Sequence, residues 1–119
     1  INDMHGHLVG DKVLTVFAQA LKKHTRQQDY LARFGGEEFV LILPGTSLDS
    51  ARQIAEDIRR DVSGMRLKNS TTREIICDLS VSLGVVQHRH GETDEAVTSR
   101  CDQALYRAKH KGRNCVVAE

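Results

Sequence analysis

The stretch RFGGEEF, residues 33–39, and the apolar run VLIL that follows it at residues 40–43 decide the fold of this chain. The apolar run predicts a buried strand, because aliphatic and β-branched residues fill it and Pro44-Gly45 ends it. Residues 30–34, YLARF, predict a shorter strand before it. Two glycines between two strands indicate a hairpin, because glycine adopts the positive φ angles of a tight turn.

Two adjacent carboxylates, Glu37 and Glu38, follow the glycines of this turn. Like charges repel at close range, so the stability of the hairpin alone does not require them. The pattern therefore predicts that a cation, or a ligand that carries one, binds at the turn.

The composition fits one compact domain that has a hydrophobic core of its own and no bulk attraction to nucleic acid or membranes. The chain has 119 residues and a formal net charge of +1. Aromatic residues make up 4%, which argues against a stacking platform for single-stranded nucleic acid. The apolar runs are too short to span a bilayer, and no signal peptide is visible. Since the chain starts at Ile1, we expect a domain excised from a longer protein, with any membrane or sensor region outside it.

The cysteines and histidines favour neither disulfides nor a structural zinc site. Cys77, Cys101 and Cys115 are odd in number and widely spaced, as in a cytoplasmic protein with reduced, buried or partly buried thiols. The histidine pairs at residues 5 and 7 and at residues 88 and 90 lack a third ligand at zinc-finger spacing.

Apolar periodicity predicts three helices and further strands around the hairpin. The first helix is expected to begin at Gly10-Asp11, with Asp11 as a candidate N-cap. The other two helices are expected after Ser47 and from Glu95 to Lys111. A single long strand is expected over residues 75–86, and a short strand over residues 115–118. This order predicts an α/β (α+β) fold, an open sheet, mixed or mainly antiparallel, that is covered by helices.

Four blocks of the sequence, in order, resemble the GGDEF family of diguanylate cyclases. They are INDMHGHLVGD at residues 1–11, the turn GGEEF at residues 35–39, LSVSLGV at residues 79–85, and DQALYRAKHKGRN at residues 102–114. The resemblance implies a fold like the palm of nucleotidyl cyclases, in which helices surround a central, mainly antiparallel sheet and a hairpin carries the signature turn.

The resemblance implies that two GTP molecules are joined into cyclic di-GMP with release of two pyrophosphates. Glu37 matches the metal-binding and general-base position, and Glu38 would support the metal or the nucleotide. Gly35 and Gly36 let the backbone approach a phosphate, and Arg33 could steady Glu37 or a phosphate. Carboxylate oxygens suit Mg²⁺ or Mn²⁺. Because one active site holds one GTP, the resemblance also implies a homodimer.

Further positions match the family's substrate contacts. Asp11 matches the carboxylate that accepts the guanine N1–H and amino group, Asn2 matches its partner at the base, and His7 matches another pocket position. Alternatively, Asp11 is only a helix cap and His7 only packs the loop. Lys109 and Arg113 match the cations that contact the triphosphate, although cations are also common at a helix C-terminus.

Arg26 and Asp29 resemble the RxxD inhibitory site of the family, where bound cyclic di-GMP gives product inhibition. Asp57 stands where some members carry an additional inhibitory arginine, for which Arg52, Arg59 and Arg60 are possible substitutes. An alternative function is therefore a catalytically inactive regulatory domain that binds cyclic di-GMP or GTP. A cyclase with another base specificity is a third possibility, against which Asp11 argues.

In the family, the first metal carboxylate and a nearby lysine lie just before the position of Ile1. The resemblance therefore implies that residues 1–119 form a GGDEF domain that lacks its first strand, and that the parent protein supplies it. Membrane attachment would involve only regions outside this sequence, and we expect the domain itself to be cytoplasmic.

Overall fold

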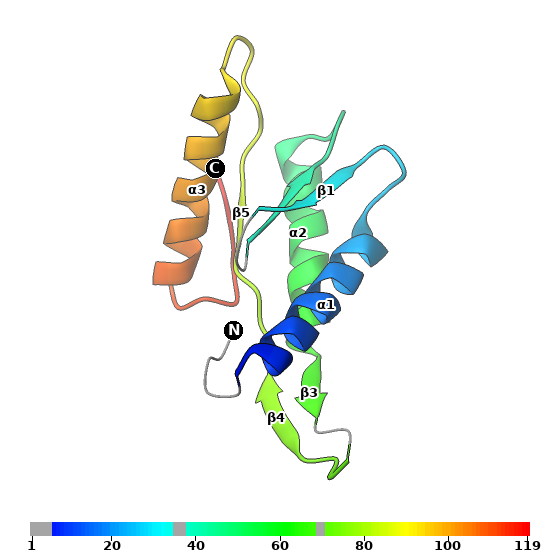
Figure 1. Cartoon of the computed structure of the whole chain (residues 1–119). Helices are drawn as coiled ribbons and strands as arrows, with labels where there is room; N and C mark the ends of the chain where they lie inside the picture. Colours follow the sequence, from blue (N-terminus) through cyan, green and yellow to red (C-terminus); the bar gives the residue numbers. More distant parts are fainter. Residues whose placement is uncertain (1–5, 35–37, 69–70) are drawn as a thin grey trace.

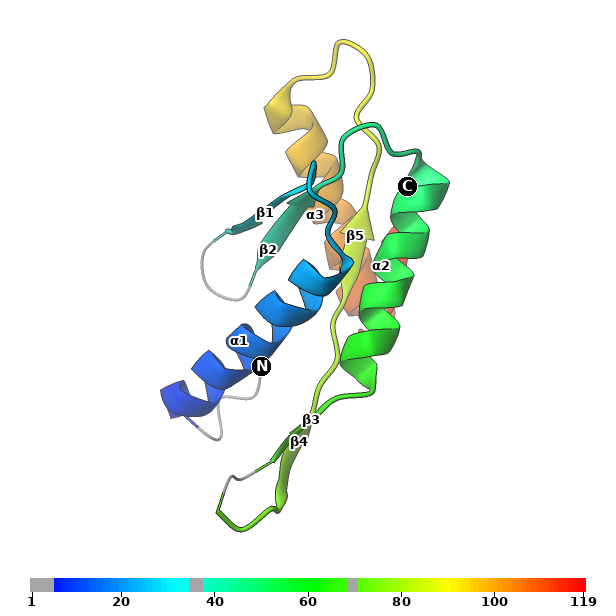
Figure 2. The ribbon, with the colours of Figure 1, turned by 90° about the vertical axis from the view of Figure 1, so that its right-hand side faces the viewer.

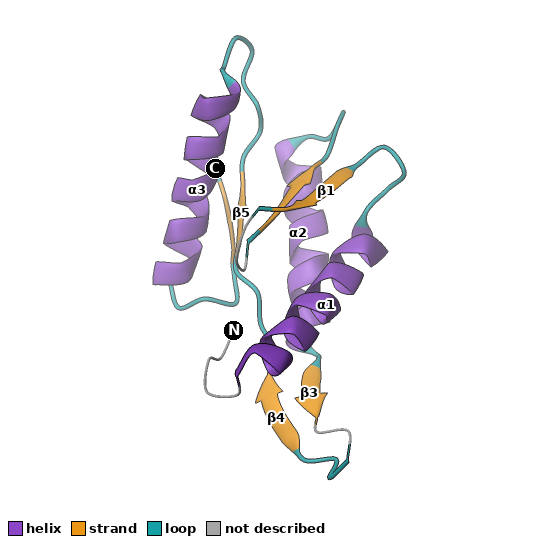
Figure 3. Ribbon diagram, in the orientation of Figure 1, coloured by secondary structure: helices purple, strands orange, loops and turns teal. Residues whose placement is uncertain are grey.

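The computed structural model describes residues 6–34, 38–68 and 71–119, and of these the side chains of residues 6–11, 76 and 77 are outside the description. Within these ranges the chain forms three helices and six short strands (Figures 1 and 3). In chain order they are α1 (Gly6–His24), β1 (Tyr30–Arg33), β2 (Phe39–Ile42), α2 (Leu48–Ser63), β3 (Arg66–Lys68), β4 (Ile75–Asp78), β5 (Leu83–Val85), α3 (Asp94–His110) and β6 (Val116–Ala118).

The strands pair two by two. β1 and β2 are antiparallel with Tyr30 opposite Ile42, and β3 and β4 are antiparallel with Arg66 opposite Asp78. β5 and β6 are parallel, with Leu83 opposite Val116. A parallel pair needs a crossover connection, and α3 provides it. The fold is thus mixed α/β, as the sequence predicts, with antiparallel pairing in two of the three described pairs.

The hydrophobic core lies between α1, α2 and the segments that follow them. Ile58 and Val62 on one face of α2 are each 1% exposed, and Val13 of α1 is 3% exposed. Full burial of a side chain such as Ile58 contributes about 2–3 kcal/mol. The remaining buried members of this core cluster are Ala20, Leu21, Leu67 and Leu79. The periodic apolar residues of the sequence therefore do form the core.

α3 packs against β5 at very short range. Ala104 and Ala108 of the helix are fully buried. A Cβ atom added at Gly84 of β5 would lie 2.4 Å from the Leu105 nitrogen and 2.8 Å from the Cys101 oxygen. Both are backbone atoms, so only glycine permits this approach of helix and strand.

α1 begins earlier than the sequence predicts. It starts at Gly6, so Asp11 lies inside the helix, and the prediction that Asp11 caps it is wrong. The physical reason is that the apolar period extends upstream, since Val9 stands four residues before Val13.

The predicted single strand over residues 75–86 is also wrong. It is divided into β4, which pairs with β3, and β5, which pairs with β6. Figure 2 shows the chain continuing from β4 to β5 along one path. The sequence did not predict β3, because Arg66–Lys68 contains a single apolar residue, Leu67.

The apolar run after the signature turn is not a fully buried strand. Val40 is 37% exposed and Ile42 is 56% exposed, whereas Phe39 and Leu41 pack against the core. The hairpin covers the core with one face only, so alternate residues of the run point to the other face.

Cys101 and Cys115 are free and half-buried. The Cys101 thiol lies 3.5 Å from the Gly84 oxygen, and the Cys115 thiol lies 3.2 Å from the Ala108 oxygen. Burial raises the pKa of Cys101. The prediction of partly buried free thiols is confirmed for these two residues, and the Cys77 side chain lies outside the description.

Among the described residues, α1, α2 and α3 are each too short or too polar to cross a membrane.

Candidate functional site

The hairpin brings the two sides of the signature turn together. The ladder places Arg33 opposite Phe39, and the Phe34 N–H donates to the Glu38 carbonyl oxygen at 2.7 Å. Glu38 is exposed just before β2. The predicted hairpin strands are confirmed, while Gly35, Gly36 and Glu37 lie outside the described residues.

A groove of about 460 Å³ lies between α1 and the hairpin. Its lining residues are Leu14, Thr15 and Ala18 of α1, with Arg33 and Phe39 of the hairpin. Concave sites for small ligands have volumes of this order. Leu14 stands three residues after Asp11, about one helical turn, so these two positions lie on the same face of α1. Helix and hairpin lie side by side in both views of the ribbon (Figures 1 and 2).

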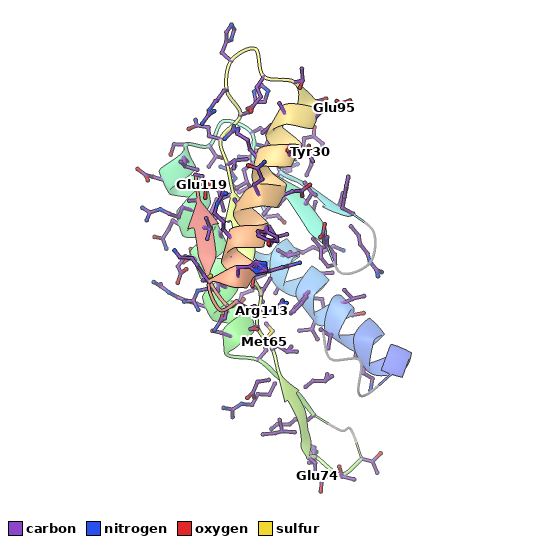
Figure 4. All side chains as sticks on the ribbon, turned by 90° about the vertical axis from the view of Figure 1, so that its left-hand side faces the viewer. Tyr30, Met65, Glu74, Glu95, Arg113 and Glu119 are labelled. Carbon is purple, nitrogen blue, oxygen red and sulfur yellow. The ribbon has the colours of Figure 1, made fainter. Side chains whose placement is uncertain are left out.

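The far end of α3 carries Lys109 and Arg113. Lys109 lies in the last helical turn and Arg113 in the connection to β6, and both side chains are exposed. Across the described ranges, neither cation has a hydrogen-bonding or ion-pairing partner. Figure 4 labels Arg113 at this end of the helix. In the described ranges, this end of α3 therefore presents two exposed cations that have no internal partner.

The backbone after α3 has an uncommon conformation. The φ angles are +117° at Gly112, +65° at Arg113 and +47° at Asn114. Outside glycine, the left-handed conformation costs roughly 1–2 kcal/mol per residue, and asparagine tolerates it best among common residues. The Arg113 N–H donates to the Ala108 carbonyl oxygen at 3.1 Å, which closes the helix end. This left-handed turn carries the predicted triphosphate contact.

Arg59 of α2 reaches the left-handed turn. Its Nη1 donates to Asn114 Oδ1 at 3.3 Å, while its Nε and Nη2 bind the Glu56 carboxylate at 3.0 and 2.5 Å. The hydrogen bond from Arg59 lowers the pKa of Glu56. Sequence reasoning missed this contact, which joins residues 55 positions apart, and considered Arg59 only for the inhibitory site.

The predicted inhibitory pair does come together. Arg26 Nη2 donates to Asp29 Oδ1 at 2.8 Å, and the Arg26 N–H donates to Asp29 Oδ2, also at 2.8 Å. The same Nη2 donates to Thr46 Oγ1 at 2.6 Å, a contact that the sequence did not reveal. The hydrogen bond from Arg26 lowers the pKa of Asp29, whose side chain is fully covered. We call these three residues the Arg26 clasp.

The helix beside the clasp has its own side-chain pairs. Asp57 accepts a hydrogen bond from Gln53 Nε2 at 2.9 Å, and Arg52 lies 3.4 Å from Asp49. Arg60 Nε lies 3.5 Å from Glu56. Each of these contacts lies within α2.

The described side chains include no group of three potential metal ligands. Of the predicted set, Glu38 is the one carboxylate that the structure describes, and Asn2 and Glu37 lie outside it. His7 and Asp11 lie in α1, but their side chains are outside the description. The carboxylate chemistry suits a divalent ion, but a complete ligand set would need residues beyond those described.

A family model described as diguanylate cyclase, GGDEF domain, matches residues 1–115. The chain is 47% identical over 115 residues to the diguanylate cyclase DgcP of Pseudomonas aeruginosa, covering 96% of this chain and 16% of that protein. It is 43% identical over 118 residues to the diguanylate cyclase DgcM of Escherichia coli, covering 99% of this chain and 27% of that protein. The chain thus spans less than a third of these relatives.

Solved structures show the same fold. The GGDEF domain of DgcB from Caulobacter crescentus with its coiled coil, in complex with c-di-GMP, has a TM-score of 0.94 at 35% identity, covering 99% of this chain and 62% of that chain. A structure described as the active GGEEF domain of a diguanylate cyclase from Vibrio cholerae has a TM-score of 0.81 at 34% identity, covering 100% of this chain and 75% of that chain.

Proposed function

This chain belongs to the GGDEF family of diguanylate cyclases, and on that premise we propose that it forms the catalytic domain of an enzyme that condenses two GTP into cyclic di-GMP. The match of the family over residues 1–115 carries the proposal, together with the signature turn in its GGEEF form. The similar domain from Vibrio cholerae is described as active and has that form of the turn.

In this proposal the signature turn holds the reacting end of the substrate. Glu37 is the general base and a metal ligand, and Glu38 supports the metal or the nucleotide. Gly35 and Gly36 leave room for a phosphate against the backbone. The hairpin ladder, closed by the Phe34–Glu38 hydrogen bond, supports these assignments because it makes a rigid base for the turn.

Guanine recognition is assigned to Asn2, His7 and Asp11. A carboxylate that accepts from both N1–H and the amino group of guanine cannot pair with adenine in the same way. The groove between α1 and the hairpin supports this assignment, since apolar Leu14 and Phe39 can flank a purine ring.

Lys109 and Arg113 would contact the triphosphate. Both are exposed cations without an internal partner in the described ranges, so an anionic ligand meets no competing carboxylate there. Charge-assisted hydrogen bonds to phosphate are stronger than neutral ones.

We include Mg²⁺, or Mn²⁺, in the proposal. Such an ion neutralises triphosphate charge and favours ionisation of the attacking 3′-hydroxyl. Glu37 is the proposed ligand from this chain. The other ligands would come from residues before Ile1, within a first strand that the parent protein supplies.

The assembly proposed for activity is a homodimer. Each domain binds one GTP, and a symmetric cyclic product requires two facing active sites. A GTP substrate and half-buried free thiols both fit a cytoplasmic location.

The Arg26 clasp is the proposed site of product inhibition. Arg26 offers a bidentate fork to a phosphate or a guanine edge, and Asp29 accepts from guanine. The similar DgcB structures contain c-di-GMP, which supports this assignment. A receptor that binds cyclic di-GMP at the clasp and lacks catalysis is the second candidate function.

The test is to incubate the full-length protein with GTP and Mg²⁺ and to separate the products by chromatography. Wild type should form cyclic di-GMP, and Glu37→Ala should lose about a hundredfold or more of the rate. Glu74→Gln, an exposed acid labelled in Figure 4 at the end of the β3–β4 arm, is the matched control. Equal product from wild type and Glu37→Ala would refute the assignment, and binding of cyclic di-GMP without turnover would favour the receptor.

A further inference from the structure

We infer that Arg59 of α2 is a positioning residue for Arg113, and that it acts by holding the left-handed turn after α3 through Asn114. The inference rests on the proposed function, which assigns Arg113 to the triphosphate of GTP.

The left-handed turn needs support from outside its own sequence. Three successive residues, Gly112, Arg113 and Asn114, have positive φ angles, and only the first lacks a Cβ atom. Backbone hydrogen bonds hold the two ends of the turn, from the Arg113 N–H to Ala108 and from the Leu83 N–H to Cys115. Between these two hydrogen bonds, the Asn114 side chain makes the contact of the turn with α2.

Arg59 is suited to hold this point because its own position is set. Two of its nitrogens are bound to Glu56, which leaves Nη1 directed to Asn114 Oδ1. The Arg59 and Glu56 side chains are only 21% and 27% exposed, so the pair is partly shielded from water. A planar guanidinium with two donors bound has a defined direction for the others, which a lysine would lack.

The consequence falls on Arg113 because it is adjacent to Asn114. Its exposed guanidinium has no partner in the described part of the chain, so the backbone alone directs it. Loss of the Arg59–Asn114 hydrogen bond would let the turn relax and would spread Arg113 over many orientations. A bound triphosphate would then have to order it, which weakens binding.

The experiment measures the dissociation constant of GTP with Mg²⁺ by calorimetry on the full-length protein. Arg59→Met should weaken GTP binding by roughly threefold to tenfold in the wild-type background. In an Arg113→Ala background, the same substitution should have almost no further effect, because the group that Arg59 positions is gone. Hydrogen exchange, read by mass spectrometry on peptides that cover residues 112–115, should accelerate in Arg59→Met.

Substitutions of Asn114 separate the hydrogen bond from the backbone conformation. Asn114→Asp keeps an acceptor for Arg59 and should bind GTP like wild type. Asn114→Gly keeps the left-handed conformation without the acceptor and should be intermediate, and Asn114→Ala loses both and should be weakest. This series carries the test if Arg59→Met does not fold. Arg66→Met, which removes the exposed ion pair with Asp78, is the matched control and should leave GTP binding unchanged.

Three results would overturn the inference: an equal loss of GTP affinity with and without Arg113, hydrogen exchange at the turn that Arg59→Met does not change, or GTP affinity that Arg113→Ala does not change. A protein that binds GTP through Arg113 but makes no cyclic di-GMP would refute the proposed cyclase activity alone. In that case the effect of Arg59 on GTP binding would still support its positioning role.

Discussion

Arg26 and Arg113 both lie in short connections at the surface, but their side chains have opposite environments. Arg26 is bound within the chain, through Asp29 and Thr46. Arg113 has no partner among the described residues, and its backbone, rather than its side chain, is held in place. One guanidinium is neutralised internally and the other is presented to solvent.

Under the proposed function, this difference separates the proposed substrate site from the proposed inhibitory site. A ligand at the Arg26 clasp must compete with Asp29, whose carboxylate is fully covered. An ion pair at the surface contributes little, so the competition lowers affinity without preventing binding. A ligand at Arg113 has no such pair to break. This arrangement fits a substrate site that is ready at all times and an inhibitory site that responds only when product accumulates.

Among the substitutions that test this comparison, Arg113→Ala should have the largest effect. We expect the kcat/KM for GTP to fall about a hundredfold, because a charge-assisted contact to the transferring phosphates is lost. Initial rates of cyclic di-GMP formation, measured before product accumulates, check this result. Arg66→Ala, another exposed arginine, should retain the wild-type rate. A wild-type rate in Arg113→Ala would end the distinction between the two sites.

Gly84→Ala should disturb the packing of α3 on β5 near Arg113 and leave the Arg26 clasp unchanged. The new Cβ would meet the backbone of α3, and we expect unfolding to become easier by about 2–3 kcal/mol, measured with denaturant. At temperatures where the variant is folded, GTP binding should weaken because α3 leads directly into the turn that carries Arg113, while cyclic di-GMP should bind the Arg26 clasp as before. Gly64→Ala, whose Cβ would meet its neighbours at 3.7 Å, is the control and should be nearly neutral.

Arg26→Ala tests the other arginine of this comparison. We expect cyclic di-GMP to inhibit roughly tenfold more weakly, because the charged hydrogen bonds that Arg26 would donate to the ligand are removed. The initial rate without product should remain that of wild type. Calorimetry with cyclic di-GMP gives the affinity, and Gln27→Ala in the same loop is the control. Unchanged affinity in Arg26→Ala would remove this residue from the inhibitory site.

The smallest expected effect concerns another arginine–carboxylate pair, which lies at the opposite end of α3 from Arg113. Arg100 binds Glu92 at 2.6 and 2.7 Å, and mainly this hydrogen bonding lowers the pKa of Glu92 from 4.5 to about 2. A lowered pKa in the folded state contributes stability above pH 4.5, and this contribution is lost as the pH falls toward 2.

Glu92→Gln should therefore flatten the fall in stability across that acid window, and Arg100→Met should do the same. Urea unfolding at a series of pH values measures the slope. The same slope in wild type and Glu92→Gln would show that the pair does not contribute in this way. A flattened slope would show that an arginine bound to a carboxylate contributes to stability at a place where no ligand is proposed. The Arg26 clasp contains a pair of the same kind.

Much of the fold could be predicted from local patterns. Apolar periodicity placed α2 and α3 to within a residue or two, and the two glycines with their flanking apolar residues placed the hairpin. The resemblance to the family's RxxD site also singled out Arg26 and Asp29, and these two residues, three apart in a turn, do form a hydrogen bond. These features depend on short stretches of chain, where sequence spacing determines distance.

The sequence by itself therefore determined the family, the hairpin with its signature turn, and the types of side chain that a nucleotide site requires. Only the tertiary structure decided that half of the apolar run faces outward, that β5 and β6 are parallel, and that Arg59 contacts Asn114. Each of these depends on how distant segments pack. No local pattern of residues encodes a contact across 55 positions, because the fold as a whole brings its two ends together.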